Sequence, residues 1–298
     1  MGNKYVIGVD LGGTKISTGI MSRQGDILGK AVTIPTDANK PRKKILGNIK
    51  KSINTALNSA KITIGSISGV GIGSPGPLDI ERGIILTPQN LPNLHYCNIK
   101  QEIQSVYSLP VYANNDANCF VLGECCFGAG KGAKIACGLT LGTGLGCGIV
   151  INGKIFAGAT DTAAEIWCSP YLNGNFEDYI SGRGIQKIYK NKSLRIAYPA
   201  EIAKWAEGGD VDAKLAWNEF GKHLGFVLSY IVNLIDPELI ILGGSISNAY
   251  ELFYQTMEKS LRENINPRPR ETVKVVKAKL GDISGVIGAA SLALSNIK

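Results

Sequence analysis

Two similar strand–turn–strand patterns, one in each half of the chain, constrain its fold most. In residues 5–21, an acid and two glycines, Asp10-Leu-Gly-Gly-Thr14, separate two apolar runs. Residues 134–151 repeat this arrangement around Gly142-Thr-Gly-Leu-Gly146. Glycine lets the backbone come close to a ligand and direct N–H groups toward it. We therefore expect each turn to join two strands and to offer amides and a threonine hydroxyl to an anion.

The repetition of the turn favours a ligand, whereas a single turn of this kind is more often structural. If the two halves pack face to face, both turns clasp one polyphosphate, and Asp10 supplies an oxygen suited to Mg²⁺, directly or through water. A dinucleotide fingerprint is disfavoured because strand pattern, not helix, follows Gly142-x-Gly144. The sequence also lacks a GxxxxGK[ST] P-loop.

The remaining apolar periodicity predicts an α/β protein with two similar halves. Further strands are expected at 27–34, 69–73, 109–113, 153–156, 239–244 and 273–277, and helices near 39–58, 98–107, 117–125, 182–190, 198–206, 210–235 and 284–297. The boundary is expected near Asn114, between a small N-terminal domain (1–114) and a larger C-terminal domain (115–298), with the last helix able to pack back on the first. The apolar stripe of the 210–235 helix is expected in the core: Leu215, Phe220, Leu224, Val227 and Ile231.

The bulk composition is that of a globular protein. Of 298 residues, 44% are hydrophobic and 19% charged. No apolar run reaches the ~20 residues of a membrane span, and no signal peptide is expected before the first strand. Seven cysteines without a CxxC pattern favour a reduced, cytoplasmic setting. A catalytic thiol is disfavoured because only His95 and His223 are present to activate one.

The net charge of +8 raises the question of nucleic-acid binding. The densest basic stretch, Lys40-Pro-Arg-Lys-Lys44, is better interpreted as the start of an amphipathic helix whose charges face solvent. A net positive charge is equally consistent with a protein that binds anionic phosphate groups of small molecules. We therefore predict small-molecule partners and no nucleic acid.

The pair Asn115-Asp116 follows the strand that ends at Ala113 and begins a predicted helix. As a purely structural residue, Asp116 would be a good N-cap. An acid at the carboxyl end of a strand, beside a domain boundary, is also where the sites of α/β proteins gather. Asp116 is therefore a candidate for chemistry as well.

Several motifs, taken in order along essentially the whole chain, resemble a known family. They are Asp10-Leu-Gly-Gly-Thr-Lys15, Gly71-Ile-Gly-Ser-Pro-Gly76, Asn114-Asn-Asp-Ala-Asn118 with Leu122-Gly-Glu124, Thr140-Leu-Gly-Thr-Gly144, Ala164-Glu165, Leu242-Gly-Gly244 and Gly285-Val-Ile-Gly-Ala-Ala290. The chain resembles a glucokinase-like sugar kinase of the ROK family, within the hexokinase–actin superfamily. The resemblance implies two ribonuclease H-like (actin-like ATPase) domains flanking a cleft, ATP with Mg²⁺, and phosphoryl transfer to a sugar hydroxyl.

The resemblance also implies a role for each matched position. Asp116 would be the general base, which orients the hydroxyl and takes its proton late in a loose transition state. Nucleotide contacts would come from Asp10 (with Mg²⁺), Gly12, Gly13, Thr14, Lys15, Thr140, Gly142, Thr143, Gly144, Gly243, Gly244 and Ser245. Sugar contacts would come from Gly76, Asn90, Asn115, Asp116, Glu165, Cys168 and Glu177.

The sequence departs from the family at Glu165-Ile-Trp-Cys168. Most members carry Glu-x-Gly-His there, followed by a Cys-x-Cys-Gly-x-x-Gly-Cys zinc loop, and this chain lacks that loop. One cysteine cannot supply the four ligands of a structural zinc site, so we predict no zinc. Trp167 could lie over a sugar face or pack in the core, and Cys168 is a shorter, weaker donor than histidine. The pocket could therefore tolerate substituents at C1 or C2.

The resulting hypothesis is an ATP-dependent hexose kinase, with glucose the leading substrate and transfer to its 6-hydroxyl. Kinases for an N-acetylhexosamine, mannose, fructose or a β-glucoside are the alternatives, and the sequence leaves both polyphosphate as donor and a homodimer open. A sugar-sensing repressor of the same family is disfavoured because Asp10 comes too early for a preceding helix-turn-helix. A non-catalytic sensor is disfavoured because Asp116, Glu165 and both glycine turns are present.

Overall fold

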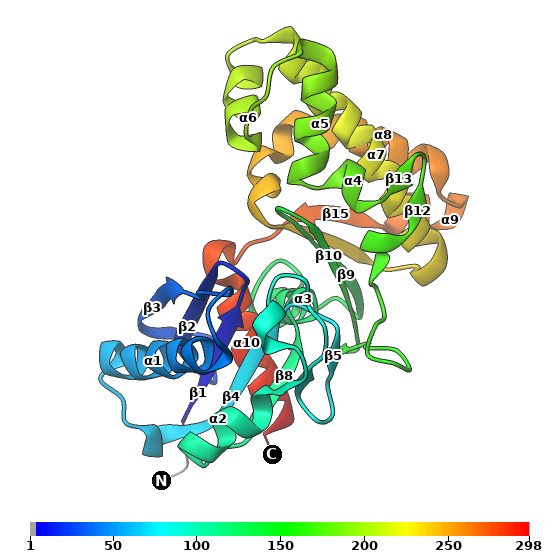
Figure 1. Ribbon diagram of the computed structural model, residues 1–298. Helices are drawn as coiled ribbons and strands as arrows, with labels where there is room; N and C mark the ends of the chain where they lie inside the picture. The colour runs from blue at the N-terminus through cyan, green and yellow to red at the C-terminus, as the bar shows by residue number, and fades with distance from the viewer. Residues whose placement is uncertain (1–3, 298) are drawn as a thin grey trace. The chain divides into compact units, whose positions relative to one another are not determined.

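In the computed structural model, which describes residues 4–297, the chain forms two compact units (Figure 1). The first unit holds residues 4–131, 153–163 and 279–297 of the described chain, and the second holds 132–152 and 164–278. The first unit extends past the boundary expected near Asn114, because the helix that begins there packs within it.

The first unit is built on a five-stranded sheet in the order β3-β2-β1-β4-β8. Its strands are β1 (Tyr5–Leu11), β2 (Lys15–Ser22), β3 (Ile27–Pro35), β4 (Ile67–Ser74) and β8 (Val111–Asn115). The first three form an antiparallel meander, and β4 and β8 continue the sheet in parallel with β1. Its helices are α1 (Arg42–Ala60), α2 (Ile99–Tyr107), α3 (Asp116–Phe127) and α10 (Ser284–Asn296), and a small sheet contains β5 (Leu78–Asp79), β6 (Ile84–Ile85) and β7 (Cys97–Asn98).

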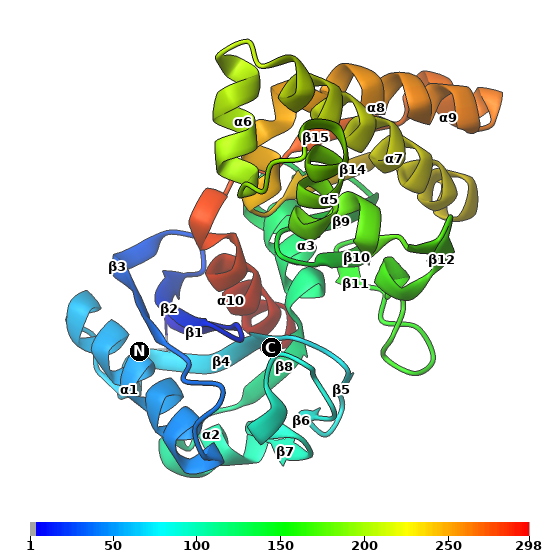
Figure 2. The ribbon, with the colours of Figure 1, turned by 45° about the horizontal axis from the view of Figure 1, so that its top comes forward.

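The two faces of this sheet are covered by different helices (Figure 2). Side chains alternate along a strand, so Ile7 and Val9 pack in the core cluster that contains the buried stripe of α1. Val6 lies on the opposite face, against α10. A Cβ atom at Gly71 on that face would overlap the carbonyl oxygen of Ala289 in α10. The C-terminal helix therefore lies directly on the sheet backbone.

The side chain of Glu124, in α3, is fully buried and joins two segments of the first unit. Its carboxylate accepts hydrogen bonds from the backbone N–H groups of Ala129 (2.8 Å), Lys279 (3.1 Å) and Leu280 (2.9 Å). These bonds tie the end of α3 to the segment that enters α10. A buried carboxylate is tolerated here because backbone donors satisfy it.

The second unit repeats the core of this topology, with strands in the order β10-β9-β14-β15. These strands are β9 (Ile135–Leu141), β10 (Leu145–Ile151), β14 (Leu239–Gly243) and β15 (Lys274–Lys277). β9 and β10 are antiparallel, and β14 runs parallel to β9 and β15. The remaining elements of the chain are β11 (Lys154–Ile155), β12 (Pro170–Tyr171), β13 (Gly174–Asn175), α4 (Glu177–Ile180), α5 (Gly182–Ser193), α6 (Pro199–Glu207), α7 (Val211–Ile235), α8 (Tyr250–Asn264), α9 (Pro267–Thr272) and the 3₁₀ helices 64–66, 92–94, 166–168, 245–249 and 281–283.

One of the α7 residues that the sequence predicts to be buried, Leu215, is exposed. Phe220, Leu224 and Val227 are fully buried, but Leu215 is 49% exposed. Leu215 precedes Phe220 by five residues, which is about 140° around a helix, so it falls outside the stripe. Trp217 occupies the core position instead.

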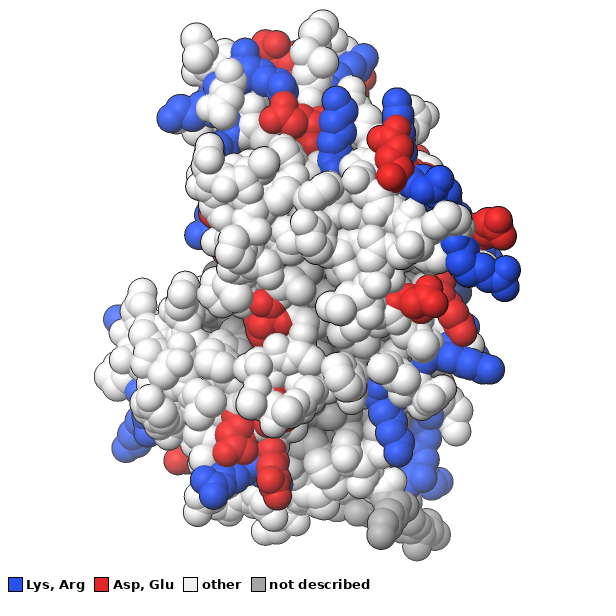
Figure 3. All heavy atoms as spheres, turned by 90° about the vertical axis from the view of Figure 1, so that its right-hand side faces the viewer, with Lys and Arg blue, Asp and Glu red and all other residues white. Residues whose placement is uncertain are grey.

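One face of the molecule shows how charged side chains are distributed. On the face shown in Figure 3, Lys and Arg side chains lie among Asp and Glu side chains rather than in one basic stretch. None of the helices within residues 4–297 combines the length and apolarity needed for a membrane span. The cysteines are free thiols, of which Cys168 is exposed.

Candidate functional site

Three parallel strands of the first unit bring the predicted acids together. In the sheet register, Asp10 of β1 lies beside Gly73 of β4, and Gly73 lies beside Asn114 of β8. Asp116 follows at the start of α3. Because the carboxyl ends of parallel strands meet at one edge, Asp10 and Asp116 are neighbours across the glycine. A Cβ atom at Gly73 would lie 3.6 Å from the Cα of Asp116.

The carboxylate of Asp10 is in an environment that disfavours its charge. Its pKa is raised to about 6, chiefly by burial and then by the nearby charge of Asp116, while Lys15 opposes both effects. The carboxylate lies against the first turn of α10, where a Cβ atom at Gly285 would be 2.5 Å from its Oδ2. Glycine at 285 is therefore needed to admit the side chain.

Asp116 is available for chemistry because another residue caps its helix. The N-cap of α3 is Asn115, whose side chain accepts hydrogen bonds from the N–H groups of Ala117 (2.8 Å) and Asn118 (3.4 Å). The purely structural alternative for Asp116, that it serves as the N-cap, therefore does not apply. Burial raises the pKa of Asp116, and a hydrogen bond from the Ala117 N–H to its Oδ1 opposes the rise. A carboxylate with a raised pKa is a better proton acceptor.

The first glycine turn is held by a residue that the sequence did not reveal. The Gly12 N–H donates to the Lys15 oxygen at 3.0 Å, which closes the turn. Thr36, fully buried, donates its hydroxyl to the Gly12 oxygen at 2.6 Å and its N–H to the Thr14 oxygen at 3.0 Å. Thr14 and Lys15 are exposed. Nothing in the local pattern around Thr36 distinguishes it from an ordinary strand end.

Two candidate sugar residues lie in loops of the same unit. Asn90 is exposed, and its backbone lies against the first turn, because a Cβ atom at Gly13 would be 2.8 Å from the Asn90 oxygen. Gly76 lies between β4 and β5 and is partly buried. The structure thus brings Asn90 beside the first turn.

The second glycine turn lies at the ends of neighbouring strands in the second unit. Thr140 of β9 pairs with Gly243 of β14, so these strand ends adjoin. The Gly142 N–H donates to the Gly144 oxygen at 3.0 Å, and Thr143 is exposed.

The segment after β14 continues this strand end. Gly244 has a φ of 79°, in the left-handed region that favours glycine. Ser245 is exposed and begins a 3₁₀ helix. The long helix α8 starts only at Tyr250.

Glu177 contacts this second turn and pairs with an arginine that the sequence analysis did not single out. The Leu145 N–H donates to Glu177 Oε2 at 2.8 Å, and the guanidinium of Arg183 pairs with Oε1. The Gly182 N–H donates to the Gly142 oxygen at 2.7 Å. The sequence indicated Glu177 by motif alone and gave no signal for Arg183.

The two residues that differ from the family pattern, Trp167 and Cys168, both form hydrogen bonds to Glu165. The indole N–H of Trp167 donates to Glu165 Oε2 at 2.6 Å, and the thiol of Cys168 donates to the Glu165 carbonyl oxygen at 3.4 Å. Trp167 packs partly against the core of the second unit. In the following hairpin, the hydroxyl of Tyr171 and Nδ1 of His223 are 2.9 Å apart. Across residues 4–297, no group of three or more His, Cys, Asp or Glu side chains is arranged to hold a metal ion.

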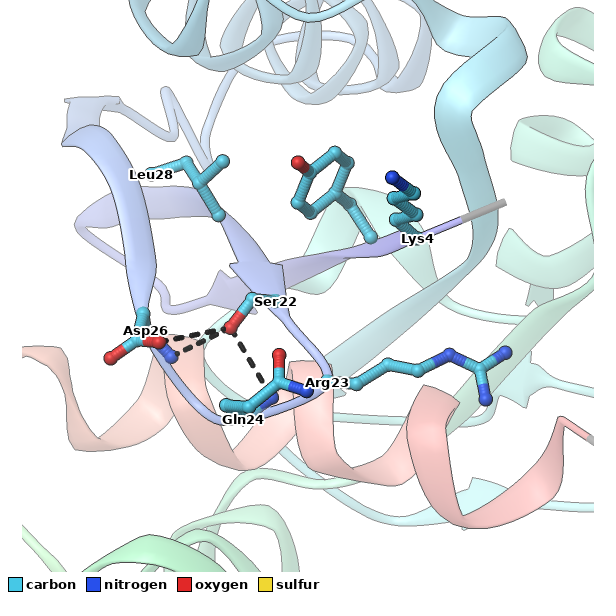
Figure 4. Close-up of a pocket in the computed structure, with 7 residues that line it drawn as sticks. Lys4, Ser22, Arg23, Gln24, Asp26 and Leu28 are labelled. Atoms are coloured by element: carbon cyan, nitrogen blue, oxygen red, sulfur yellow. Dashed lines mark hydrogen bonds between the residues drawn. The ribbon is translucent and has the colours of Figure 1, made fainter. Parts of the chain in front are cut away.

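A hollow of about 530 Å³ lies in the first unit (Figure 4). It is lined by Lys4, Tyr5, Ser22, Arg23, Gln24, Asp26 and Leu28. Tyr5 pairs with Ser22 at the end of β1 and β2 opposite the first glycine turn. The hydroxyl of Ser22 already accepts hydrogen bonds from the N–H groups of Gln24 and Asp26. We therefore exclude this hollow from the candidate site.

Known proteins are similar to this chain in both sequence and fold. The ROK family model matches residues 6–296. A glucokinase of Thermotoga maritima is 31% identical, covering 96% of each chain, and an N-acetyl-D-glucosamine kinase of Photobacterium profundum is 32% identical, covering 98% of this chain and 99% of that one. A ROK family glucokinase from Streptomyces griseus, solved in complex with glucose and AMPPNP, has a TM-score of 0.84 and 30% identity, covering 98% of this chain and 100% of that one. These matches confirm the predicted α/β, actin-like ATPase fold. The chain belongs to the ROK family.

Proposed function

We propose that this protein is an ATP-dependent sugar kinase that phosphorylates a hexose hydroxyl. One observation carries the proposal: Asp10 in β1 and Asp116, directly after β8, are neighbours across Gly73 of β4, and each has a raised pKa. An isolated aspartate, with a pKa near ~3.9, is a weak base toward an alcohol. Relatives named glucokinase and N-acetyl-D-glucosamine kinase, matched over nearly their whole length, support the reaction class.

Asp116 is the general base in this proposal. Phosphoryl transfer passes through a loose transition state, so the sugar hydroxyl loses its proton late. Asp116 orients this hydroxyl toward the γ-phosphate and then accepts the proton, which a raised pKa favours. Because Asn115 caps α3, the carboxylate of Asp116 can change partner without undoing the helix start.

The nucleotide contacts are assigned to the two glycine turns. Each turn offers backbone amides and a threonine hydroxyl, Thr14 or Thr143, to phosphate oxygens, with Thr140, Lys15 and the 243–245 segment adding donors. Asp10 suits Mg²⁺ because a cation offsets the cost of a carboxylate held beside another carboxylate. The ion would neutralise charge on the phosphate oxygens.

Glucose is the substrate we propose first, with transfer to its 6-hydroxyl. Glu165, Glu177, Asn115, Cys168, Gly76 and Asn90 are the remaining candidate sugar contacts. N-acetylglucosamine is the second candidate. A relative named N-acetyl-D-glucosamine kinase is 32% identical, and Cys168 replaces the bulkier histidine of the family pattern. Mannose, fructose and β-glucosides complete the panel to be tested.

The setting that we propose is cytoplasmic, without a nucleic-acid partner, and a homodimer is compatible with family membership. Free, mostly buried thiols support a reducing compartment. On the face shown in Figure 3, Lys and Arg lie among Asp and Glu, so this face does not resemble a nucleic-acid surface. A gel-shift assay with genomic DNA provides a direct check, and a retarded band at physiological salt would argue for the repressor alternative.

The test of function is a coupled assay of ADP release with the sugar panel, using ATP or polyphosphate as donor. We expect Asp116→Asn to lower kcat at least ~100-fold while the KM for sugar stays within roughly tenfold, because the base acts mainly in the transition state. Asp26→Asn, an exposed aspartate of the same unit, is the control. A near-normal kcat for Asp116→Asn removes this residue as the base.

A further inference from the structure

The segment that leads from β8 into α3, and carries Asp116, contains two buried asparagines. Asn114, in β8, is 4% exposed, and Asn118, in the first turn of α3, is 2% exposed. Asparagine is mostly a surface residue, because its amide must find hydrogen-bond partners when it is buried. The reason for burying two amides here therefore lies in the bonds that they make.

One oxygen atom joins the end of the strand to the start of the helix. Asn114 Oδ1 accepts a hydrogen bond from Asn118 Nδ2 at 3.0 Å and another from the Asn115 N–H at 2.8 Å. We call this pair of bonds the amide bridge. Asn114 precedes Asp116 by two residues and Asn118 follows it by two, so the amide bridge spans the backbone of Asp116.

The other end of the Asn118 amide shows that stability alone does not explain this residue. Within residues 4–297, Asn118 Oδ1 is buried and has no hydrogen-bond partner. The reverse orientation of the amide would place this oxygen against Asn114 Oδ1, another acceptor. A leucine, with the same branched skeleton, would avoid the cost of burying an unpaired oxygen. The contribution of Asn118 therefore lies in the donor that it offers to Asn114.

The carboxylate of Asp116 depends on this backbone for its position. The Ala117 N–H lies 2.8 Å from Asp116 Oδ1 and also 2.8 Å from Oδ1 of Asn115, the cap of α3. A donor that is shared between two acceptors cannot point straight at both, so each bond is weaker. The direction of the carboxylate is thus set largely by the backbone between residues 114 and 118, which the amide bridge holds.

We propose that Asn114 and Asn118 are positioning residues for phosphoryl transfer, which act by holding the backbone of Asp116 through the amide bridge. This inference rests on the proposed function, because it needs Asp116 to be the general base. Neither asparagine is assigned a contact with sugar or nucleotide. Loss of the bridge should therefore act on kcat, since a displacement of about 1 Å can cost ~100-fold in rate.

The experiment removes the amide bridge from either side. We expect Asn114→Leu and Asn118→Leu each to lower kcat about 10- to 100-fold and to change the KM values for sugar and ATP less than about threefold. The double variant should be within about twofold of the slower single variant, because both substitutions break the same bridge. A thermal melt checks that each variant folds, and the smaller Asn118→Ala takes the place of Asn118→Leu if the leucine does not fit.

A matched control comes from another buried hydrogen bond of the first unit. The hydroxyl oxygens of Thr18, in β2, and Ser52, in α1, are 2.8 Å apart, and both side chains are fully buried. Ser52→Ala removes this bond without touching the segment from 114 to 118. It should lower the melting temperature and leave kcat within about twofold of wild type.

The inference and the proposed function fail separately. If the wild-type chain phosphorylates no sugar of the panel, the proposed function is wrong and the inference falls with it. If Asp116→Asn abolishes activity but the folded Asn118 variant keeps a wild-type kcat, the inference alone is overturned. Losses that multiply in the double variant, or an equal loss of kcat in Ser52→Ala, overturn it as well.

Discussion

Replacing Asp10 with asparagine should stabilise the unliganded protein at neutral pH, although this residue is proposed to act in nucleotide binding. The pKa of Asp10 is raised from 3.8 to about 6, chiefly by burial and then by the charge of Asp116. A shift of roughly two units corresponds to about 3 kcal/mol, since each pKa unit is about 1.4 kcal/mol. This is an upper estimate of what the ionised carboxylate costs the folded first unit.

Whether stability rises or falls with pH depends on how many protons the folded and the unfolded states bind. Between pH 3.8 and about 6, the folded protein keeps the Asp10 proton more tightly than the unfolded chain does. Stability therefore falls as pH rises through this window, and the cost is complete above pH ~6. Asp10→Asn removes the ionisation, so its advantage over wild type should be small at pH 4.5 and reach up to about 3 kcal/mol at pH 8.

The assay must report on the first unit. Trp167, Trp205 and Trp217 all belong to the second unit, so tryptophan fluorescence is unsuitable. Hydrogen exchange of peptides from β1 and α10, measured from pH 4.5 to 8, gives the free energy of opening where Asp10 lies. Asp26→Asn, which alters an exposed carboxylate, is the control. Curves for wild type and Asp10→Asn that stay parallel across this range would refute the electrostatic reasoning.

Two further substitutions test how the first unit is held together. Glu124→Gln places an amide opposite one of the three backbone donors, and we expect a loss of about 1–3 kcal/mol in thermal unfolding, whereas the exposed Glu81→Gln should change nothing. Gly71→Ala should cost about 1–3 kcal/mol because its Cβ atom overlaps the Ala289 carbonyl oxygen. Gly47→Ala, in α1 with no heavy atom within 4 Å of the added Cβ, should instead stabilise by about 0.5–1 kcal/mol. A Gly71→Ala protein as stable as wild type would contradict the packing of α10.

Local signals predicted the strands and the turns well, because apolar alternation and glycine act over a few residues. The helix start at 116 shows the limit of such signals: Asn115 and Asp116 are both good caps, and only the backbone conformation decides that Asn115 is the cap. Leu215 shows another limit, since a stripe must keep the helical period to stay buried.

Sequence patterns did not predict the contacts between residues that lie far apart in the chain. Glu177 meets the second glycine turn across 32 positions of sequence, and its partner Arg183 has no motif signal. Thr36 holds the first glycine turn through hydrogen bonds that depend on where β3 ends. The roles assigned to the site residues stay predictions until the variants are measured.

The position of α10 has a consequence for how the chain acquires its structure. Val6 and Met21, near the start of the chain, pack against Ile287 and Ala290, near its end. During synthesis, one apolar face of the N-terminal sheet stays uncovered until α10 has left the ribosome. The second unit, whose segments are closer together in sequence, can fold earlier, so loss of the final helix would trap a nascent chain with an exposed, aggregation-prone surface.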